Sequence, residues 1–175
     1  MNFHMIGDTS SPILLLYRTM INAASVREYL EEELARRNLF LVEVSVRPAN
    51  KISVFIDSIK GITLEECMSI SRFLESKLDR NTEDFELEVS SPGLDKPLKL
   101  PVQFEKNIGR IIDIVKSDGI KITGRLLAIS SGSIRLETEK TVKDRITHKK
   151  RTEQNVQDIK LEEIKTAKVI ISLKK

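Results

Sequence analysis

The residues best suited to chemistry in this sequence are cations concentrated within residues 140–151. Six Lys and Arg side chains stand there against one carboxylate, Asp144. The six are Lys140, Lys143, Arg145, Lys149, Lys150 and Arg151. Such a cluster suits contact with nucleic-acid phosphates, because each contact releases condensed counterions. No aromatic residue is interleaved, so contacts would go to the backbone and not to stacked bases. The competing interpretation is a loop kept solvated by its charge.

Residues that could support catalysis or bind a metal are poorly represented. The histidines His4 and His148 have no cysteine or carboxylate at metal-ligand spacing. Cys67 falls on the apolar stripe of a predicted helix without a basic neighbour to activate it, which is typical of a core residue. Asp57 and Asp95 could be drawn as an acid/base pair, but both occupy positions where turns favour Asp. We therefore expect no catalytic residue, no metal, no cofactor and no enzyme activity.

Charge is distributed unequally along the 175 residues. Residues 1–98 carry 11 Lys and Arg against 16 Asp and Glu, a net of −5, whereas residues 99–175 carry 18 against 10, a net of +8. The asymmetry suggests two domains, a basic one suited to phosphates and an acidic one suited to a cationic partner. Ordinary variation between solvated surfaces is the alternative.

Cysteine content and hydropathy bear on the compartment. The single cysteine excludes an internal disulfide and is consistent with a reducing environment. No apolar run approaches the roughly 20 residues needed to cross a bilayer. We expect a cytoplasmic protein with no membrane association.

The first half of the chain predicts an α+β layer. Residues 1–20 match nothing that follows, and we expect a dispensable extension, with disorder as one interpretation. Capping boxes at residues 25–28 and 63–66 predict two helices, the first stopping at Asn38. The second helix is expected to bury Leu64, Cys67, Met68, Phe73, Leu74 and Leu78. Alternation predicts strands at 40–47 and 51–57.

In the second of these strands, Ile52, Val54 and Ile56 are predicted to face inward and Phe55 outward. Covering by another part of the chain is one explanation for an outward Phe, and a partner surface is the other.

Residues 85–98 are the most informative stretch. Phe85, Leu87 and Val89 alternate with Glu86, Glu88 and Ser90, which predicts a strand. Pro92 and Gly93 should end it, because Pro lacks a ladder donor and Gly takes backbone angles closed to other residues. The sequence Asp-Lys-Pro at residues 95–97 then holds the chain extended. A domain junction is expected here, giving domains 21–98 and 99–175.

The second half reads as short strands with tight turns. Strands are predicted at 108–115, 121–130, 133–139 and 167–173, with turns at 117–119 and 131–132. A polar stretch at 140–157 interrupts them, and 159–164 is a short strand or turn. This pattern suggests a small closed barrel.

The string Leu-Glu-Val-Ser-Ser-Pro-Gly-Leu-Asp-Lys-Pro-Leu at residues 87–98 closely resembles the signature of the bacterial ribosome maturation factor RimP family. Residues 55–57, 61–63, 67, 71–72, 78–79 and 107–110 also look like family positions. The resemblance implies an α+β fold class: a KH-like domain of two helices and three strands, followed by a small Sm-like (SH3-like) β-barrel. The stretch 140–157 departs from the family in being longer and more basic than in its shortest members.

The resemblance further implies a non-enzymatic factor that assists assembly of the small (30S) ribosomal subunit. Its implied partners are the immature small subunit, small-subunit rRNA and a small-subunit ribosomal protein near the decoding centre. Arg110 then joins the cations of residues 140–151 as an RNA-binding candidate. Candidates for contact with the ribosomal protein, or between domains, are Phe55, Glu86, Glu88, Ser90, Ser91, Asp95 and Lys96. We expect a monomer; the rival is an Sm-like general RNA-binding regulator, which would form rings.

Overall fold

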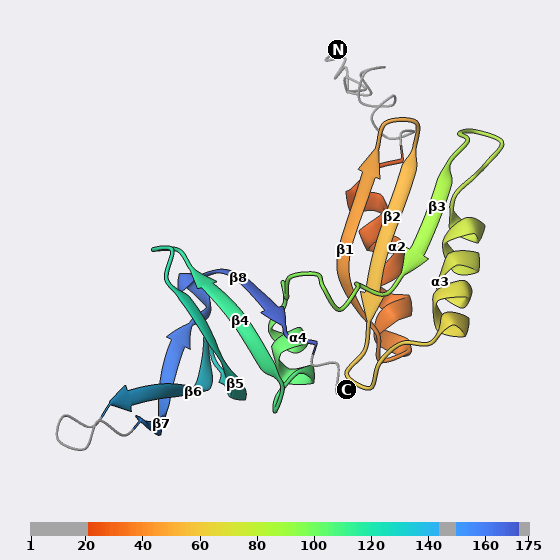
Figure 1. The fold of residues 1–175 in the computed structure, drawn as a ribbon. Coiled ribbons are helices and arrows are strands. Elements are labelled where there is room, and N and C mark those ends of the chain that lie inside the picture. Colours follow the sequence, from red (N-terminus) through yellow and green to blue (C-terminus); the bar gives the residue numbers. More distant parts are fainter. Residues whose placement is uncertain (1–20, 144–149, 172–175) are drawn as a thin grey trace, which may run out of the picture. The chain divides into compact units, whose positions relative to one another are not determined.

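The computed structural model describes the backbone of residues 21–143 and 150–171, and the side chains of residues 21–139 and 154–171 (Figure 1). Contacts divide the chain into two compact units. The first unit comprises residues up to Ile56 together with Thr63–Ser90, and the second comprises Asp57–Ile62 together with residues from Ser91 onward. The short segment Asp57–Ile62 therefore packs with the second unit.

A three-stranded sheet forms the first unit, with strand order β1-β2-β3. The strands are β1 (Phe40–Arg47), β2 (Lys51–Asp57) and β3 (Glu86–Ser90). Strands β2 and β3 are parallel, with Val54 opposite Val89. The predicted inward face of β2 is confirmed, since Ile52, Val54 and Ile56 are at most 1% exposed.

Two helices pack on this sheet, α2 (Ala23–Arg36) and α3 (Leu64–Lys77). Helix α2 contacts β1, α3 contacts β3, and the helices contact each other (Figure 1). Helix α2 begins earlier than predicted, because Asn22 is the N-cap and accepts hydrogen bonds from the amides of Ala24 and Ser25. The predicted stop at Asn38 is confirmed by its left-handed φ of 56°.

The capping box that begins α3 is confirmed. The Thr63 amide donates to Glu66 Oε2 at 2.7 Å, and the Glu66 amide donates to Thr63 Oγ1 at 3.2 Å. The predicted buried stripe is wrong at Leu64 and Met68, which are 72% and 46% exposed. The buried line of this helix runs instead through Cys67, Ile70 and Leu74, and the helical period places Leu64 and Met68 on its flank.

A buried carboxylate joins the two helices. Glu33 is 4% exposed and accepts hydrogen bonds from Arg37 Nε at 2.7 Å and from Arg36. The hydrogen bond from Arg37 lowers the pKa of Glu33 in spite of its burial. Arg37 Nη1 also donates to Ser69 Oγ of α3 at 2.6 Å. Arg37 thus links the C-terminal end of α2 to α3. The two arginines neutralise the buried carboxylate of Glu33.

The second unit is an antiparallel sheet with one short helix. Its elements are α4 (Pro101–Lys106), β4 (Ile111–Lys116), β5 (Lys121–Ser130), β6 (Ser133–Lys143), β7 (Lys150–Lys160), a 3-10 turn (Leu161–Glu163) and β8 (Ile164–Val169). The strand order is β7-β6-β5-β4-β8. No ladder joins the edge strands β7 and β8 within the described residues, so the predicted closed barrel is not found there. The predicted turns are confirmed at Gly119 and Gly132, with φ of 89° and 85°.

The core of this unit is aliphatic apart from one ring. It consists of Phe104, Ile112, Ile114, Leu126, Ile134, Leu136, Ile159 and Ala167. Helix α4 contributes Phe104, and β5 supplies Leu126. No described helix of either unit is long and apolar enough to cross a membrane.

Several boundaries in this half differ from those predicted. The polar stretch 140–157 is not an interruption, because β6 continues to Lys143 and β7 begins at Lys150. The backbone register runs without a break from Ser133 opposite Lys160 to Lys143 opposite Lys150, so the ladder continues through this polar stretch. Helix α4 was not predicted, and its start is marked by Pro101 at the first helical position. The last strand is Ile164–Val169, earlier than the predicted 167–173.

Gly124 occupies a place in β5 where β6 passes very close. A Cβ atom there would lie 2.6 Å from the carbonyl oxygen of Glu137. We expect Gly124→Ala to lower the free energy of unfolding of the second unit by about 1–3 kcal/mol, since the backbone must shift. Urea unfolding measures the change. Lys121→Ala, an exposed change in the same strand, is the matched control and should stay within about 0.5 kcal/mol. Equal midpoints for Gly124→Ala and the unchanged protein would contradict this account.

Candidate functional site: a cationic pocket in the second unit

A pocket of about 480 Å³ lies within the second unit. It is lined by Val169 of β8 and by three stretches of chain: the segment Asp57–Ile62, residues 91–98, and residues from Gln103 of α4 to Arg110. Each stretch contains positions that the sequence resemblance singled out. Four cations and one carboxylate are among its lining residues: Lys60, Lys96, Lys106, Arg110 and Asp57.

An ion pair holds the segment Asp57–Ile62 against α4. Asp57 Oδ1 accepts hydrogen bonds from Lys106 Nζ at 2.6 Å and from the Ser58 amide at 2.8 Å. The side chains of Asp57 and Lys106 are only 10% and 21% exposed. The loop then turns through Gly61, whose φ is 94° and whose carbonyl oxygen accepts from Ser58 Oγ at 2.6 Å. The carboxylate thus has a structural role.

The helical wall of the pocket is internally satisfied. Gln103 is buried, and its Oε1 accepts from the amides of Lys99 and Leu100 at 2.7 and 3.0 Å. Asn107 Nδ2 donates to the Gln103 carbonyl at 2.7 Å. Among described residues no buried side-chain polar atom lacks a partner. These amides therefore position the charged residues around them and leave ligand contacts to the cations.

Residues 91–98 form the third wall. The Lys96 amide donates to the Gly93 carbonyl at 2.9 Å, and the Leu98 amide donates to the Ala167 carbonyl of β8 at 2.8 Å. Gly93 is not among the residues with positive φ. The expectation of a special backbone angle at Gly93 was wrong. The nearest atom that a Cβ would meet there is Asp95 Oδ1 at 2.5 Å, the end of an exposed side chain that can move aside.

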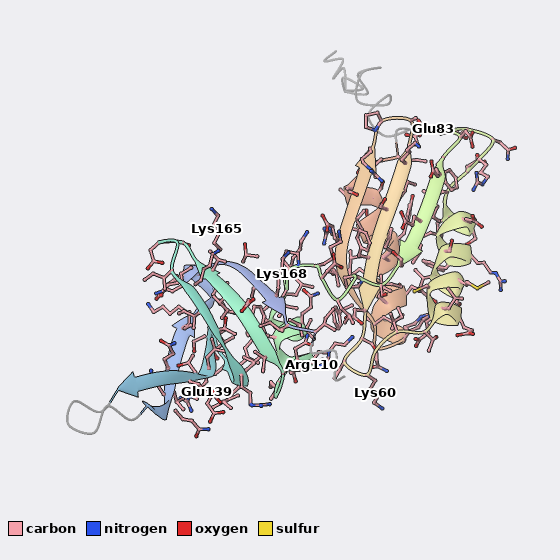
Figure 2. All side chains as sticks on the ribbon, in the orientation of Figure 1. Lys60, Glu83, Arg110, Glu139, Lys165 and Lys168 are labelled. Carbon is pink, nitrogen blue, oxygen red and sulfur yellow. The ribbon has the colours of Figure 1, made fainter. Side chains whose placement is uncertain are left out.

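Three of the pocket's cations carry uncompensated charge. Lys60, Lys96 and Arg110 are exposed, and none forms an ion pair within the described part of the chain (Lys60 and Arg110 are labelled in Figure 2). Several other cations of the unit are occupied. Lys116 lies 2.9 Å from Glu163, whose hydrogen bond raises the pKa of Lys116.

Arg135 is likewise occupied, since its Nε donates to Asp158 at 2.8 Å and this hydrogen bond lowers the pKa of the Asp158 carboxyl. The pocket therefore presents three unpaired cations together, whereas Lys116 and Arg135 of the sheet are neutralised by carboxylates.

The predicted RNA-binding residues are only partly placed. Arg110 lies at the pocket. Arg145 and Lys149 lie outside the described residues. The backbones of Lys140, Lys143, Lys150 and Arg151 belong to β6 and β7, but their side chains are outside the description. Their role stays a prediction.

The predicted protein-binding residues divide between two surfaces. Ser91 and Lys96 line the pocket. Asp95, which directly precedes Lys96 in the sequence, is exposed. The others lie in the first unit. Glu86 pairs with Lys51 at 3.0 Å, and both side chains are more than half exposed.

Glu88 is exposed, and Phe55 lies opposite Ser90 in the register with its side chain partly exposed. Strand alternation places these residues on the face of the sheet opposite the buried Ile52 and Val54.

Sequence reasoning missed two cations of the pocket, Lys60 and Lys106. A signal existed for Lys60, which directly precedes the turn glycine Gly61. Lys106 gave none, because its helix was not predicted.

Comparison with known proteins identifies the family. A family model described as the RimP N-terminal domain matches residues 29–95. Ribosome maturation factor RimP from Porphyromonas gingivalis is 38% identical over 152 residues, which are 87% of this chain and 100% of that protein. The protein of the same name from Flavobacterium psychrophilum is 39% identical over 147 residues, 83% of this chain and 95% of its own length. This chain belongs to the RimP family.

The family match confirms the resemblance seen in the sequence. The matched region 29–95 of the RimP N-terminal domain includes the segment Asp57–Ile62 and the first part of residues 91–98. Two of the three stretches that line the pocket thus carry RimP sequence features, and the third, ending at Arg110, follows directly after them.

The ion pair between Asp57 and Lys106 should contribute measurably to the free energy of unfolding. A double-mutant cycle with Asp57→Asn and Lys106→Met is expected to give a coupling free energy of about 1–3 kcal/mol, because both groups are largely desolvated. Chemical unfolding measures each variant. The matched control is the exposed pair Lys160 and Glu162, 3.4 Å apart, with an expected coupling below about 1 kcal/mol. Equal coupling in the two cycles would contradict a supporting role for Asp57.

Proposed function

We propose that this RimP-family chain is a non-enzymatic, cytoplasmic factor that assists maturation of the small (30S) ribosomal subunit. It binds the immature subunit as a monomer, with contacts to small-subunit rRNA and to a ribosomal protein near the decoding centre. The observation that carries the proposal is similarity over nearly the whole chain to proteins named ribosome maturation factor RimP.

The charge distribution supports a division of labour within this function. Residues 99–175 carry a net of +8, Arg110 included, and Lys60 and Lys96 bring two further cations to the pocket that no described carboxylate neutralises. A surface of this sign attracts RNA. The first 98 residues carry a net of −5, a sign that attracts a strongly cationic protein.

The fold agrees with this proposal in its coarse features. Two helices on three strands are compatible with a KH-like first domain, and five antiparallel strands are compatible with an Sm-like second domain. We propose these fold types for the two domains, with boundaries near 21–98 and 99–175. Two modest contacts made by one chain raise the effective concentration of each partner for the other without covalent chemistry.

Co-sedimentation with ribosomal particles tests the function. The protein is incubated separately with precursor small subunits, mature small subunits, large subunits and whole ribosomes. We expect association mainly with precursor small subunits. Absence of association with them, or equal association with all four particles, would contradict the proposal.

The cations of residues 140–151 supply a first test of RNA contact. Replacing Lys149, Lys150 and Arg151 together with Ala should weaken RNA binding and flatten its dependence on salt, because fewer counterions are released. Binding titrations at several salt concentrations measure the slope. An unchanged slope would contradict a phosphate contact and would support a loop kept solvated by its charge.

The carboxylates of β3 test the protein contact. Glu86→Gln with Glu88→Gln should weaken binding to the ribosomal protein several-fold, and the neutral replacement avoids placing a like charge beside Lys51. A matched control removes two exposed carboxylates of α2, Glu28→Gln with Glu32→Gln. Affinity is measured by calorimetry. The same small loss in both variants would indicate a general field effect and would contradict a specific contact at β3.

A further inference from the structure

We propose that the cationic pocket of the second unit is a binding subsite for a backbone phosphate of RNA. Lys60, Lys96 and Arg110 would hold the phosphodiester, and Ile59 and Leu94 would pack against the adjoining nucleotide. The inference rests on the proposed function, which it deepens by naming where an RNA strand is held.

The pocket has a net positive charge. Asp57 is the one carboxylate among its lining residues, and Lys106 neutralises it at 2.6 Å. Lys60, Lys96 and Arg110 remain without an ion-pair partner in the described structure. The exposed Asp95 carboxylate approaches Gly93 of the pocket wall, but three unpaired cations still leave an excess of positive charge, and a concave site of this sign selects an anion. A strongly cationic ribosomal protein would be repelled from it.

Apolar side chains at the same pocket favour a nucleotide over a small inorganic anion. Ile59 and Leu94 also line the pocket, yet they are 48% and 60% exposed. Cations beside exposed aliphatic groups match a nucleotide, which presents a phosphate next to a ribose and an apolar base face. A site for a small inorganic anion would not need them.

The scaffold of the pocket is fixed from within the second unit. The backbone of Arg110 is held on both sides: its carbonyl accepts from the Leu126 amide at 2.9 Å, and the Gly109 amide donates to the Leu126 carbonyl at 2.7 Å. The ion pair Asp57–Lys106 fixes the loop that carries Lys60. The cations therefore project from anchored backbone, so that less ordering is needed on binding.

The test measures the affinity of the full chain for small-subunit rRNA, transcribed in vitro, at several salt concentrations. The pocket variant is Lys60→Gln with Lys96→Gln and Arg110→Gln. The control variant is Lys121→Gln with Lys165→Gln and Lys168→Gln, three exposed cations of the same unit outside the pocket lining (Lys165 and Lys168 are labelled in Figure 2). Both variants lose the same net charge.

We expect the pocket variant to bind at least about tenfold more weakly. The slope of log affinity against log salt should become shallower by about 0.7–0.9 for the lost phosphate contact. The control variant should keep most of the affinity and slope. Ile59→Ser with Leu94→Ser should weaken binding while leaving the slope unchanged, because no counterion is involved.

Three results would overturn the inference. A pocket variant that matches the control variant in affinity and slope shows that only overall charge matters. A pocket variant that keeps its RNA slope but loses the ribosomal protein assigns the pocket to that protein. Full affinity in the Ile59 and Leu94 variant removes the nucleotide contact. Each leaves the proposed function intact as long as the unchanged protein co-sediments with precursor small subunits; failure of that co-sedimentation is what rejects the function.

Discussion

The ion pair between Asp57 and Lys106 is the contact on which the cationic pocket of the second unit depends. It closes the segment Asp57–Ile62 onto α4 at 2.6 Å, with both side chains mostly removed from water. Lys106 neutralises the Asp57 carboxylate. Asp57 is therefore not a partner for the other cations of the pocket, Lys60, Lys96 and Arg110. Removal of either partner would leave the other as an uncompensated, largely buried charge, which is costly in a protein interior.

This arrangement separates two kinds of surface along one chain. In the second unit, three unpaired cations gather at a pocket whose segments Asp57–Ile62 and 91–95 lie within the matched RimP N-terminal domain. In the first unit, Glu86 and Glu88 lie on the sheet face that the helices leave uncovered, and Glu86 already shares its charge with Lys51. Opposite signs on two compact units suit a factor that handles a polyanion and a polycation in one process.

Much of the fold could be read from the sequence because local signals there agreed with the tertiary structure. The Thr63 capping box, the alternation in β2 and the turn glycines Gly119 and Gly132 all act over a few residues, and all were confirmed. The failures involved longer-range packing. Which side of α3 meets the sheet decides whether Leu64 is exposed. Backbone pairing extends β6 and β7 through a stretch whose polar sequence gave no strand signal. The pocket could not be foreseen, since Lys106 lies on an unpredicted helix and meets Asp57 across 49 residues.

The most direct measurement is a cryo-electron microscopy structure of the protein bound to a precursor small subunit, at a resolution that shows side chains. The account predicts a backbone phosphate of rRNA within hydrogen-bond distance of at least two of Lys60, Lys96 and Arg110, with Asp57 still paired to Lys106. A pocket filled by a ribosomal protein, or left in solvent while RNA contacts lie elsewhere, would contradict it.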